Sequence, residues 1–318
     1  MNKSIVPKFS TLCLGTLLLF SCSSCDYFDN LGGNETGIQK KITPSKHSAK
    51  PIFVLYHGLG AMPSDLESIE EYLKAAYPKA SVIARQRTDT QRKSIEDQSK
   101  KHTKDILSTL QEKDVKKKRP TILVGHSQGG LIALCDGPKL IKAGYKVAGI
   151  VTIGSPLEGA PVLNRLLHYK RTLKHSGAPQ ALINWLDGLS GKGSGVEDMR
   201  PESSFLKNLQ KRLEQNSISI LAIGGDASGL YKSIDNIVPL SELLGQTLGD
   251  KKNDLLLPLN SQLAKNIKTK HLKRSIVEAT HGHIKGLPEE TSLVSSQKTK
   301  NAMIHFIRNE LKKSHTVN

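Results

Sequence analysis

The chain has 318 residues and carries 46 Lys and Arg against 29 Asp and Glu, a formal net charge of +17. This length accommodates one large domain with an insertion, and such a basic surface attracts anionic membranes or acidic glycans. Aromatic residues make up only 4% of the chain and do not alternate with basic ones, so the composition argues against specific nucleic-acid recognition.

The first residues have the pattern of an export signal. Lys3 and Lys8 precede the apolar stretch Thr11–Phe20, which is too short to span a bilayer stably. The sequence Leu19-Phe20-Ser21-Cys22 resembles a bacterial lipobox, in which the cysteine becomes diacylated. We therefore expect a signal peptide at residues 1–21 and a lipid on Cys22.

This lipid would anchor the protein in the bacterial cell envelope, and Ser23 after the cysteine favours, by the same resemblance, the periplasmic side of the outer membrane. Residues 22–50 are rich in Gly, Asn, Ser and Lys, which is typical of a flexible tether. The membrane is thus an expected partner, through the anchor and the basic surface. The alternative is an ordinary secretory signal that is cut nearby, which would give a secreted protein.

Residues 51–318 are expected to form one domain. Six apolar segments predict strands that alternate with helical stretches, at 52–56, 81–84, 121–124, 147–153, 218–223 and 275–278. This alternation indicates an α/β fold with a mostly parallel central sheet and helices on both faces. Residues 158–217 interrupt the rhythm. They hold Trp185 and the glycine-rich stretch 188–195, so they predict a cap or lid that can move.

The first strand runs into His57-Gly58-Leu59-Gly60, and the third ends at Gly125-His126-Ser127-Gln128-Gly129. Glycines after a strand let the backbone approach a ligand closely. A serine on a sharp strand-to-helix turn needs small neighbours, and its hydroxyl then projects above the sheet. Ser127 is the predicted nucleophile, and the backbone N–H groups of Leu59 and Gln128 would form the oxyanion hole.

These motifs, together with Val147–Ala160, resemble the lipase and esterase branch of the α/β-hydrolase family. Val196–Leu206 is also similar to the segment that follows the lid in secreted lipases. The resemblance covers residues 50–310 with gaps, and it implies an α/β-hydrolase fold with a triad in the chain order Ser, Asp, His. One departure is Asp136-Gly137-Pro138, which predicts an early end or a kink in the helix behind the nucleophile.

The family order requires an acid after the strand at 218–223, and two aspartates lie in a suitable turn. Asp254, in Asn-Asp-Leu-Leu-Leu-Pro, is favoured over Asp235, in Asp-Asn-Ile-Val-Pro, because its flanking residues resemble the lipase pattern more fully. Asp226 is a third choice. Each of them could instead be a turn aspartate that binds its own backbone.

The general base is expected on the loop after the strand at 275–278. His283, which an isoleucine follows, resembles the family's histidine better than His281, which would then line the pocket. Histidines in Lys-rich stretches, such as His102, are expected at the surface. No histidine has metal-ligand spacing, so we predict no metal and no other cofactor. Cys135 is expected to be a buried small hydrophobe.

These parts predict a carboxylic ester hydrolase acting on lipid or acyl esters. His283 would take the proton of Ser127, Asp254 would hold the imidazole in the required tautomer, and water would release the acyl group from the serine. The same triad could serve an acyltransferase or a thioesterase. A noncatalytic binding lipoprotein is the alternative from a different class, and the intact serine and oxyanion turn argue against it.

Overall fold

The computed structural model describes residues 50–90, 92–113, 116–164, 195–230, 252–283 and 287–316, all within one compact unit, Ile42–Asn318. The expected signal peptide, Cys22 and the tether before residue 50 lie outside the described residues, as do Trp185 and Asp235. No helix in the described part of the chain is both long enough and apolar enough to cross a membrane.

Six strands form one sheet in the order β2-β1-β3-β4-β5-β6, and every neighbouring pair is parallel. Their bounds are Ile52–Tyr56 (β1), Ser81–Ala84 (β2), Pro120–His126 (β3), Lys146–Ile153 (β4), Ile220–Gly225 (β5) and Leu272–Val277 (β6). The predicted parallel sheet is confirmed. The last two strands differ most from the prediction, because β5 begins two residues later and β6 three residues earlier than expected.

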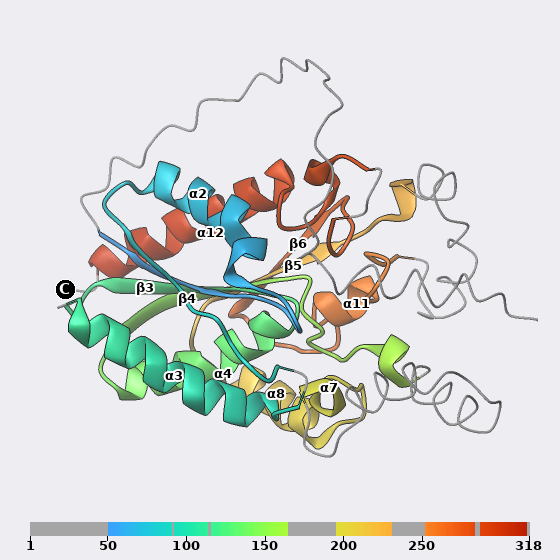
Figure 1. The fold of residues 1–318 in the computed structure, drawn as a ribbon, viewed down its shortest axis with the longest axis horizontal. Coiled ribbons are helices and arrows are strands. Elements are labelled where there is room, and N and C mark those ends of the chain that lie inside the picture. Colours follow the sequence, from blue (N-terminus) through green and yellow to red (C-terminus); the bar gives the residue numbers. More distant parts are fainter. Residues whose placement is uncertain are drawn as a thin grey trace, which may run out of the picture. The chain divides into compact units, whose positions relative to one another are not determined.

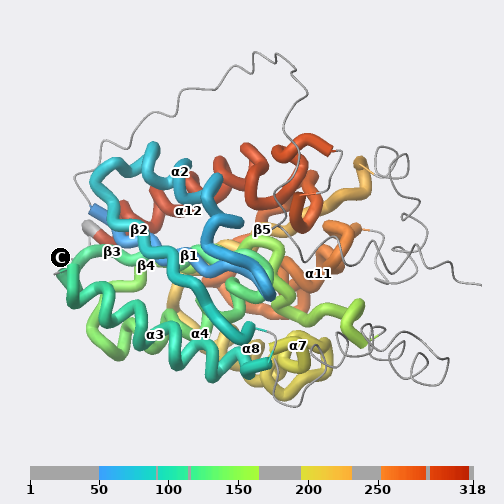
Figure 2. Tube along the Cα trace, in the orientation of Figure 1, coloured from blue at the N-terminus to red at the C-terminus, as the bar shows by residue number. Residues whose placement is uncertain are grey.

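Helices cover both faces of this sheet (Figures 1 and 2). One face carries α3 (Ile95–Glu112), α4 (Gln128–Lys142) and α8 (Ser204–Gln215), and the other carries α2 (Glu67–Ala76) and α12 (Gln297–Thr316). Short helical turns complete the described elements: η1 (Pro63–Leu66), α7 (Gly195–Asp198), η2 (Ser228–Leu230), α11 (Leu259–Gln262) and η3 (Glu289–Thr291).

Successive side chains of a strand point to opposite faces of the sheet, so each strand contributes to two cores. In β1 the side chains of Ile52, Val54 and Tyr56 belong to the core beneath α3, α4 and α8. The alternate residues Phe53 and Leu55 belong to the core beneath α2 and α12. All five are buried, as expected for a parallel sheet that is covered on both faces.

The chain changes direction across the sheet between β1 and β3. After β1 it proceeds to the edge strand β2, whereas after β3 it proceeds the other way, to β4, β5 and β6. The carboxyl ends of β1 and β3 therefore flank a topological switch point, where α/β sheets bind their ligands. The loops expected to hold the nucleophile and the oxyanion hole both start there.

Two local expectations were wrong. The helix after Ser127 does not end early at Asp136-Gly137-Pro138, because α4 continues through Pro138 to Lys142; the alternative, a kink at this point, stays a prediction. His102 is not at the surface but 2% exposed, since it lies on the face of α3 that packs on the sheet. The expectation that Cys135 is buried is confirmed, and its thiol is free.

The predicted cap region at 158–217 is described only in part. Its C-terminal portion contains α8, whose buried residues Phe205, Leu206 and Leu209 belong to the core beneath the sheet. This helix therefore forms the crossover between β4 and β5. Residues 165–194, where a lid would lie, are outside the described residues.

Candidate active site

Ser127 lies between β3 and α4 in a backbone conformation, φ 55° and ψ −129°, that few residues other than glycine adopt. Its N–H donates to the carbonyl of Ile153 at 2.9 Å, which ties the turn to the end of β4. A Cβ on Gly125 would overlap the backbone of Gly129, and one on Gly129 would overlap the carbonyl of Tyr56. Glycine is therefore required on both sides of the serine.

The turn after β1 passes directly beside the serine. A Cβ on Gly58 would lie 3.2 Å from Ser127 Cβ and 3.6 Å from Ser127 Oγ. Leu59 follows this glycine, and Gln128 is the first residue of α4, so its N–H has no acceptor within the helix. The structure thus brings the two segments of the expected oxyanion hole together around the serine.

Asp254 is fully buried, and both of its side-chain oxygens have hydrogen-bond partners. Its Oδ1 accepts the N–H groups of Leu256 and Leu257 at 3.0 and 2.7 Å, and its Oδ2 lies 2.6 Å from His281 Nδ1. Leu255 between them has a positive φ of 77°, so the turn holds the carboxylate at some cost in backbone strain. A carboxylate that accepts from Nδ1 leaves Nε2 of the same ring to act as a base.

The histidine that contacts Asp254 is His281, whereas the sequence analysis favoured His283. The N–H of His281 also donates to the carbonyl of Asp254 at 2.8 Å, and His281 is 6% exposed. The N–H of its neighbour Thr280 donates to the carbonyl of Thr291 at 2.8 Å, and the Thr280 carbonyl accepts the N–H of Leu293 at 2.8 Å, so the loop is held on both sides. His283 is exposed. The conformation of this loop decides which of the two histidines contacts Asp254, and the sequence pattern does not reveal it.

Asp226, the third candidate for the acid, makes a turn contact. Asp226 Oδ1 accepts the N–H of Ser228 at 3.1 Å, which is the turn contact that the sequence analysis gave as its alternative. Asp235 lies outside the described residues.

The end of β4 joins the serine to the histidine. Ile153 accepts the N–H of Ser127, and a Cβ on the next residue, Gly154, would lie 3.3 Å from His281 Nδ1. Gly154 also has a φ of 55°, which a side chain would oppose. One strand end therefore contacts both groups, and glycine leaves room for the imidazole.

His126 supports His281 from the other side. Its Nε2 lies 3.0 Å from the carbonyl of His281, and the two rings are 4.8 Å apart between centroids. Burial, and then the charge of His281, lower the pKa of His126 to about 3. His126 is therefore neutral, with its proton on Nε2, and donates to the loop that carries His281.

A buried arginine that the sequence did not indicate holds the turn after β1. Arg87 is 5% exposed, and its Nη2 donates to the carbonyl of His57 and, at 3.4 Å, to that of Gly58. Its Nη1 donates to Gln98 Oε1 at 2.8 Å and to Gln128 Oε1 at 3.4 Å. The guanidinium thus links the turn after β1 to Gln128, the residue after Ser127.

Further hydrogen bonds hold the same turn. The N–H of Arg87 donates to His57 Nε2 at 2.9 Å, and the N–H of Gly60 donates to Thr90 Oγ1 at 2.9 Å. Burial lowers the pKa of Arg87 to about 10 and, with the charge of Arg87 as a second cause, that of His57 to about 4. The arginine stays charged and the histidine neutral at physiological pH, and an arginine in a loop gave no signal in the sequence.

A second buried polar cluster lies between α3 and α4. Asp136, which is fully buried, accepts from Ser99 Oγ, and its Oδ2 lies 3.0 Å from His102 Nδ1. The ring of His102 packs 4.6 Å from that of Tyr56, whose pKa burial raises. His102 can therefore be buried in a Lys-rich helix, because Asp136 gives its ring nitrogen a hydrogen-bond partner inside the core.

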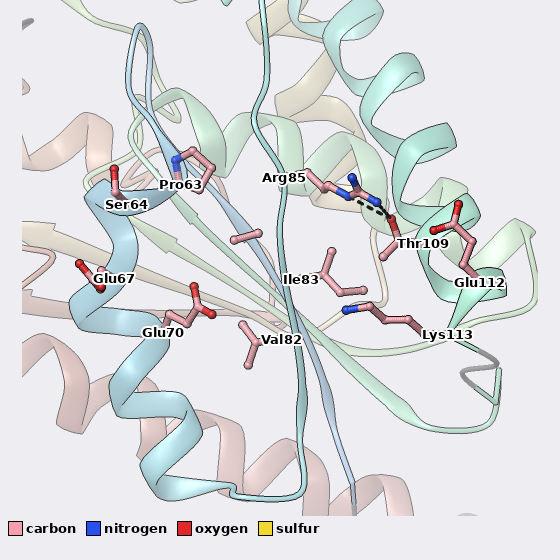
Figure 3. Close-up of a pocket in the computed structure, with 11 residues that line it drawn as sticks. Pro63, Ser64, Glu67, Glu70, Val82, Ile83, Arg85, Thr109, Glu112 and Lys113 are labelled. Atoms are coloured by element: carbon pink, nitrogen blue, oxygen red, sulfur yellow. Dashed lines mark hydrogen bonds between the residues drawn. The ribbon is translucent and has the colours of Figure 1, made fainter. Parts of the chain in front are cut away.

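A surface groove of about 370 Å³ lies elsewhere, along the edge strand β2 between α2 and α3 (Figure 3). Arg85 Nη2 donates to Thr109 Oγ1 at 2.6 Å across it, and Glu67, Glu70 and Glu112 line it. None of its lining residues belongs to the turns around Ser127. In the described part of the chain no group of three or more His, Cys, Asp or Glu could hold a metal ion.

A serine on a strained strand-to-helix turn, with an Asp-His pair on the later loops of a parallel sheet, defines an α/β-hydrolase. Solved structures share this fold. Bacillus licheniformis lipase BlEst2 is 17% identical with a TM-score of 0.50, over 85% of this chain and 96% of its own. The metagenomic carboxyl esterase MGS0156 is 13% identical with a TM-score of 0.52, over 89% of this chain and 82% of its own.

The family model for palmitoyl protein thioesterase matches residues 51–223, more than half of the chain. The chain therefore belongs to the palmitoyl protein thioesterase family, and it is a hydrolase of the esterase and thioesterase class. No curated protein matches the sequence significantly.

Proposed function

We propose that the protein is a serine hydrolase that cleaves acyl esters or thioesters with the triad Ser127, His281 and Asp254. The observation that carries this proposal is the 2.6 Å contact between Asp254 Oδ2 and His281 Nδ1 beside a serine at φ 55°. Under this proposal His281 replaces the sequence-favoured His283.

The reaction follows from the positions of these groups. Nε2 of His281 accepts the hydroxyl proton as Ser127 Oγ attacks the acyl carbonyl, and Asp254 stabilises the resulting imidazolium. The backbone N–H groups of Leu59 and Gln128 donate to the oxyanion. The imidazolium then protonates the leaving oxygen or sulfur, and a water molecule, deprotonated by the same histidine, releases the carboxylic acid from the serine.

For the substrate we propose a fatty acyl group, held as an ester or a thioester. Support comes from the description of the matching family model, palmitoyl protein thioesterase, and from the lipase and carboxyl esterase among the structural neighbours. The triad acts on either bond, because both pass through the same tetrahedral oxyanion.

The test compares a thioester and an oxygen ester that carry the same acyl chain, over a series of chain lengths. Ser127→Ala should lower kcat by at least about 10⁴-fold on both, with an unchanged thermal unfolding midpoint. Preference for the thioester would identify a thioesterase. Acyl transfer to an added alcohol in place of release to water would identify an acyltransferase. Ser127→Ala with unchanged activity, or no turnover by the folded wild type, would contradict the proposal.

We also propose that a lipid on Cys22 anchors the enzyme in the cell envelope, with residues 22–50 as a tether. The support is the lipobox-like Leu19-Phe20-Ser21-Cys22. Cells that express the chain and receive an alkyne-tagged fatty acid should label it, and Cys22→Ser should remove the label. Equal labelling of this variant, or none of the wild type, would contradict the anchor.

A further inference from the structure

Basic side chains gather where the chain enters β1, β2, β3 and β4. The strand register makes these four amino ends level, because Ile52 pairs with Ser81 and with Thr121, and Pro120 pairs with Lys146. We refer to the basic residues here as the amino-edge cluster. They are Lys50, Lys79, Lys116, Lys117, Lys118, Arg119, Lys142 and Lys146, six of them exposed and Arg119 and Lys146 partly buried.

Hydrogen bonds join the segments that carry the cluster. Arg119 Nε donates to the carbonyl of Lys50 at 2.6 Å, and its Nη2 donates to Ser81 Oγ at 3.1 Å. The N–H of Lys146 donates to the carbonyl of Lys117 at 3.2 Å. Four strands about 4.8 Å apart span roughly 15 Å, which is about two Debye lengths at physiological ionic strength. A partner therefore meets these charges as one patch.

The described part of the protein does not neutralise this patch. The described connections at 50–51, 77–80, 116–119 and 143–145 contain no Asp or Glu, and among the described residues no carboxylate pairs with a cluster side chain. Lys146 Nζ donates to the neutral carbonyl of Ser314. Only Lys142 lies in the last turn of a helix, where the helix dipole alone would favour a lysine.

We propose that the amino-edge cluster binds an anionic membrane surface. Flexible lysines on level loops suit a plane of phosphate head groups, and the exposed Ile141 (45%), beside Lys142, adds an apolar side chain to the same edge. The chain enters β1 through Lys50, a member of the cluster. The proposed tether to Cys22 would therefore join the domain at this edge.

Binding in this way would orient the active site, a consequence that rests on the proposed function. β3 has seven residues and rises about 3.3 Å per residue, so Ser127 lies about 20 Å from the amino edge. The strands of Figure 1 run from the amino edge on the left to the active-site loops on the right. Ser127 would face away from the supporting membrane, and its acyl substrates would arrive from the aqueous side.

The first experiment measures binding of the chain from Cys22 onward, which retains the whole compact unit, to vesicles rich in phosphatidylglycerol. K116Q/K117Q/K118Q should lower the partition coefficient by roughly 100-fold, because each lysine near such a surface contributes about fivefold. The matched control K100Q/K101Q/K104Q changes the charge equally on exposed positions of α3 and should lower it by less than about fivefold.

Several outcomes would overturn the membrane proposal. Equal losses in the two triple variants would show diffuse attraction to the net charge. Binding to duplex DNA with no binding to the anionic vesicles would assign the cluster to another polyanion. Ser127→Ala should bind vesicles as the wild type does, so failure of the proposed reaction and failure of membrane binding are distinguishable.

The second experiment tests the orientation with an environment-sensitive fluorophore on one exposed cysteine, in a chain whose Cys22 and Cys25 are serine and whose Cys135 is buried. Ile141→Cys lies at the amino edge, and Met62→Cys lies after the oxyanion turn; the two native side chains are 45% and 51% exposed. The emission should shift to the blue on vesicles only for the label at residue 141. A shift only at residue 62 would place the active site against the membrane and contradict the proposal.

Discussion

At the carboxyl edge of the sheet the backbone is strained and the polar groups are buried, whereas at the amino edge the backbone is relaxed and the polar groups are exposed. Positive φ values follow the strand ends at Gly60, Asp89, Ser127 and Gly154. Among the described residues, the turns leading into β1, β2, β3 and β4 have one, at Gly144. The basic residues differ too, since Arg87 is buried at the carboxyl edge while Lys116–Lys118 are exposed at the other.

This contrast shows how one scaffold separates two kinds of chemistry. Catalysis needs groups that are held in place and removed from water, so the carboxyl edge accepts strain and buried charge. Long-range attraction to a surface needs only net charge near water, so the amino edge uses flexible lysines in ordinary loops. The sheet between them keeps the two regions about one strand length apart.

The largest expected difference between the edges concerns their glycines. Gly129→Ala should lower the free energy of unfolding by more than about 4 kcal/mol, or prevent folding, because its Cβ would overlap the backbone at Tyr56. Gly144 has a φ of 90°, and a Cβ there would meet only the Lys117 side chain, at 3.4 Å. Gly144→Ala should therefore lower the free energy of unfolding by about 1–2 kcal/mol. Urea unfolding measures both free energies, and equal losses would contradict the contrast in backbone strain between the two edges.

The next effect concerns the buried arginine. Arg87→Met should lower kcat by about 10- to 100-fold with little change in KM, because the oxyanion turn loses the donor that holds the His57 and Gly58 carbonyls. Arg87→Lys should recover little of the lost kcat, since an ammonium group cannot span both turns. Steady-state kinetics measures kcat and KM separately. A loss of stability with unchanged kcat would make Arg87 a purely structural residue.

The third effect is a pH dependence of stability, which comes from two buried histidines. The pKa values of His57 and His126, about 4 and 3 in the folded state, lie below the ordinary value near 6.5. The unfolded state thus binds protons first as the pH falls. The free energy of unfolding should be highest above pH 6.5 and decrease toward pH 3, by at most about 1.4 kcal/mol per pH unit for each histidine.

His126→Asn removes one of these groups and keeps a donor for the His281 carbonyl. Urea unfolding at pH 7, 5.5 and 4 should therefore show a smaller decrease in this variant than in the wild type. A decrease of the same size in both proteins would mean that His126 binds protons equally in the folded and unfolded states.

Local patterns predicted the parts of the molecule that local forces determine. The apolar runs before Gly58 and Gly125 indicated buried parallel strands, and the small residues around Ser127 indicated the sharp turn. Both interpretations depend on neighbours in sequence, and the fold confirms the strands. The glycine requirement is visible again in the structure as overlaps that any Cβ would create at Gly129.

Contacts between distant segments were beyond this reasoning. The choice between His281 and His283 depends on how the loop after β6 meets the Asp254 turn, where the N–H of His281 donates to the Asp254 carbonyl and Nδ1 lies 2.6 Å from Oδ2. The burial of Arg87 likewise depends on the His57 carbonyl, which lies in a different loop and accepts from the guanidinium. Such positions are set by tertiary packing and leave no periodic signal in the sequence.

The most direct test of the proposed site is covalent labelling by a fluorophosphonate, with the modified residue identified by mass spectrometry. The wild type and His283→Ala should be labelled on Ser127 at similar rates, while His281→Ala should be labelled at least about 10³-fold more slowly. Fast labelling of His281→Ala together with loss of labelling in His283→Ala would contradict the account and return the general base to residue 283.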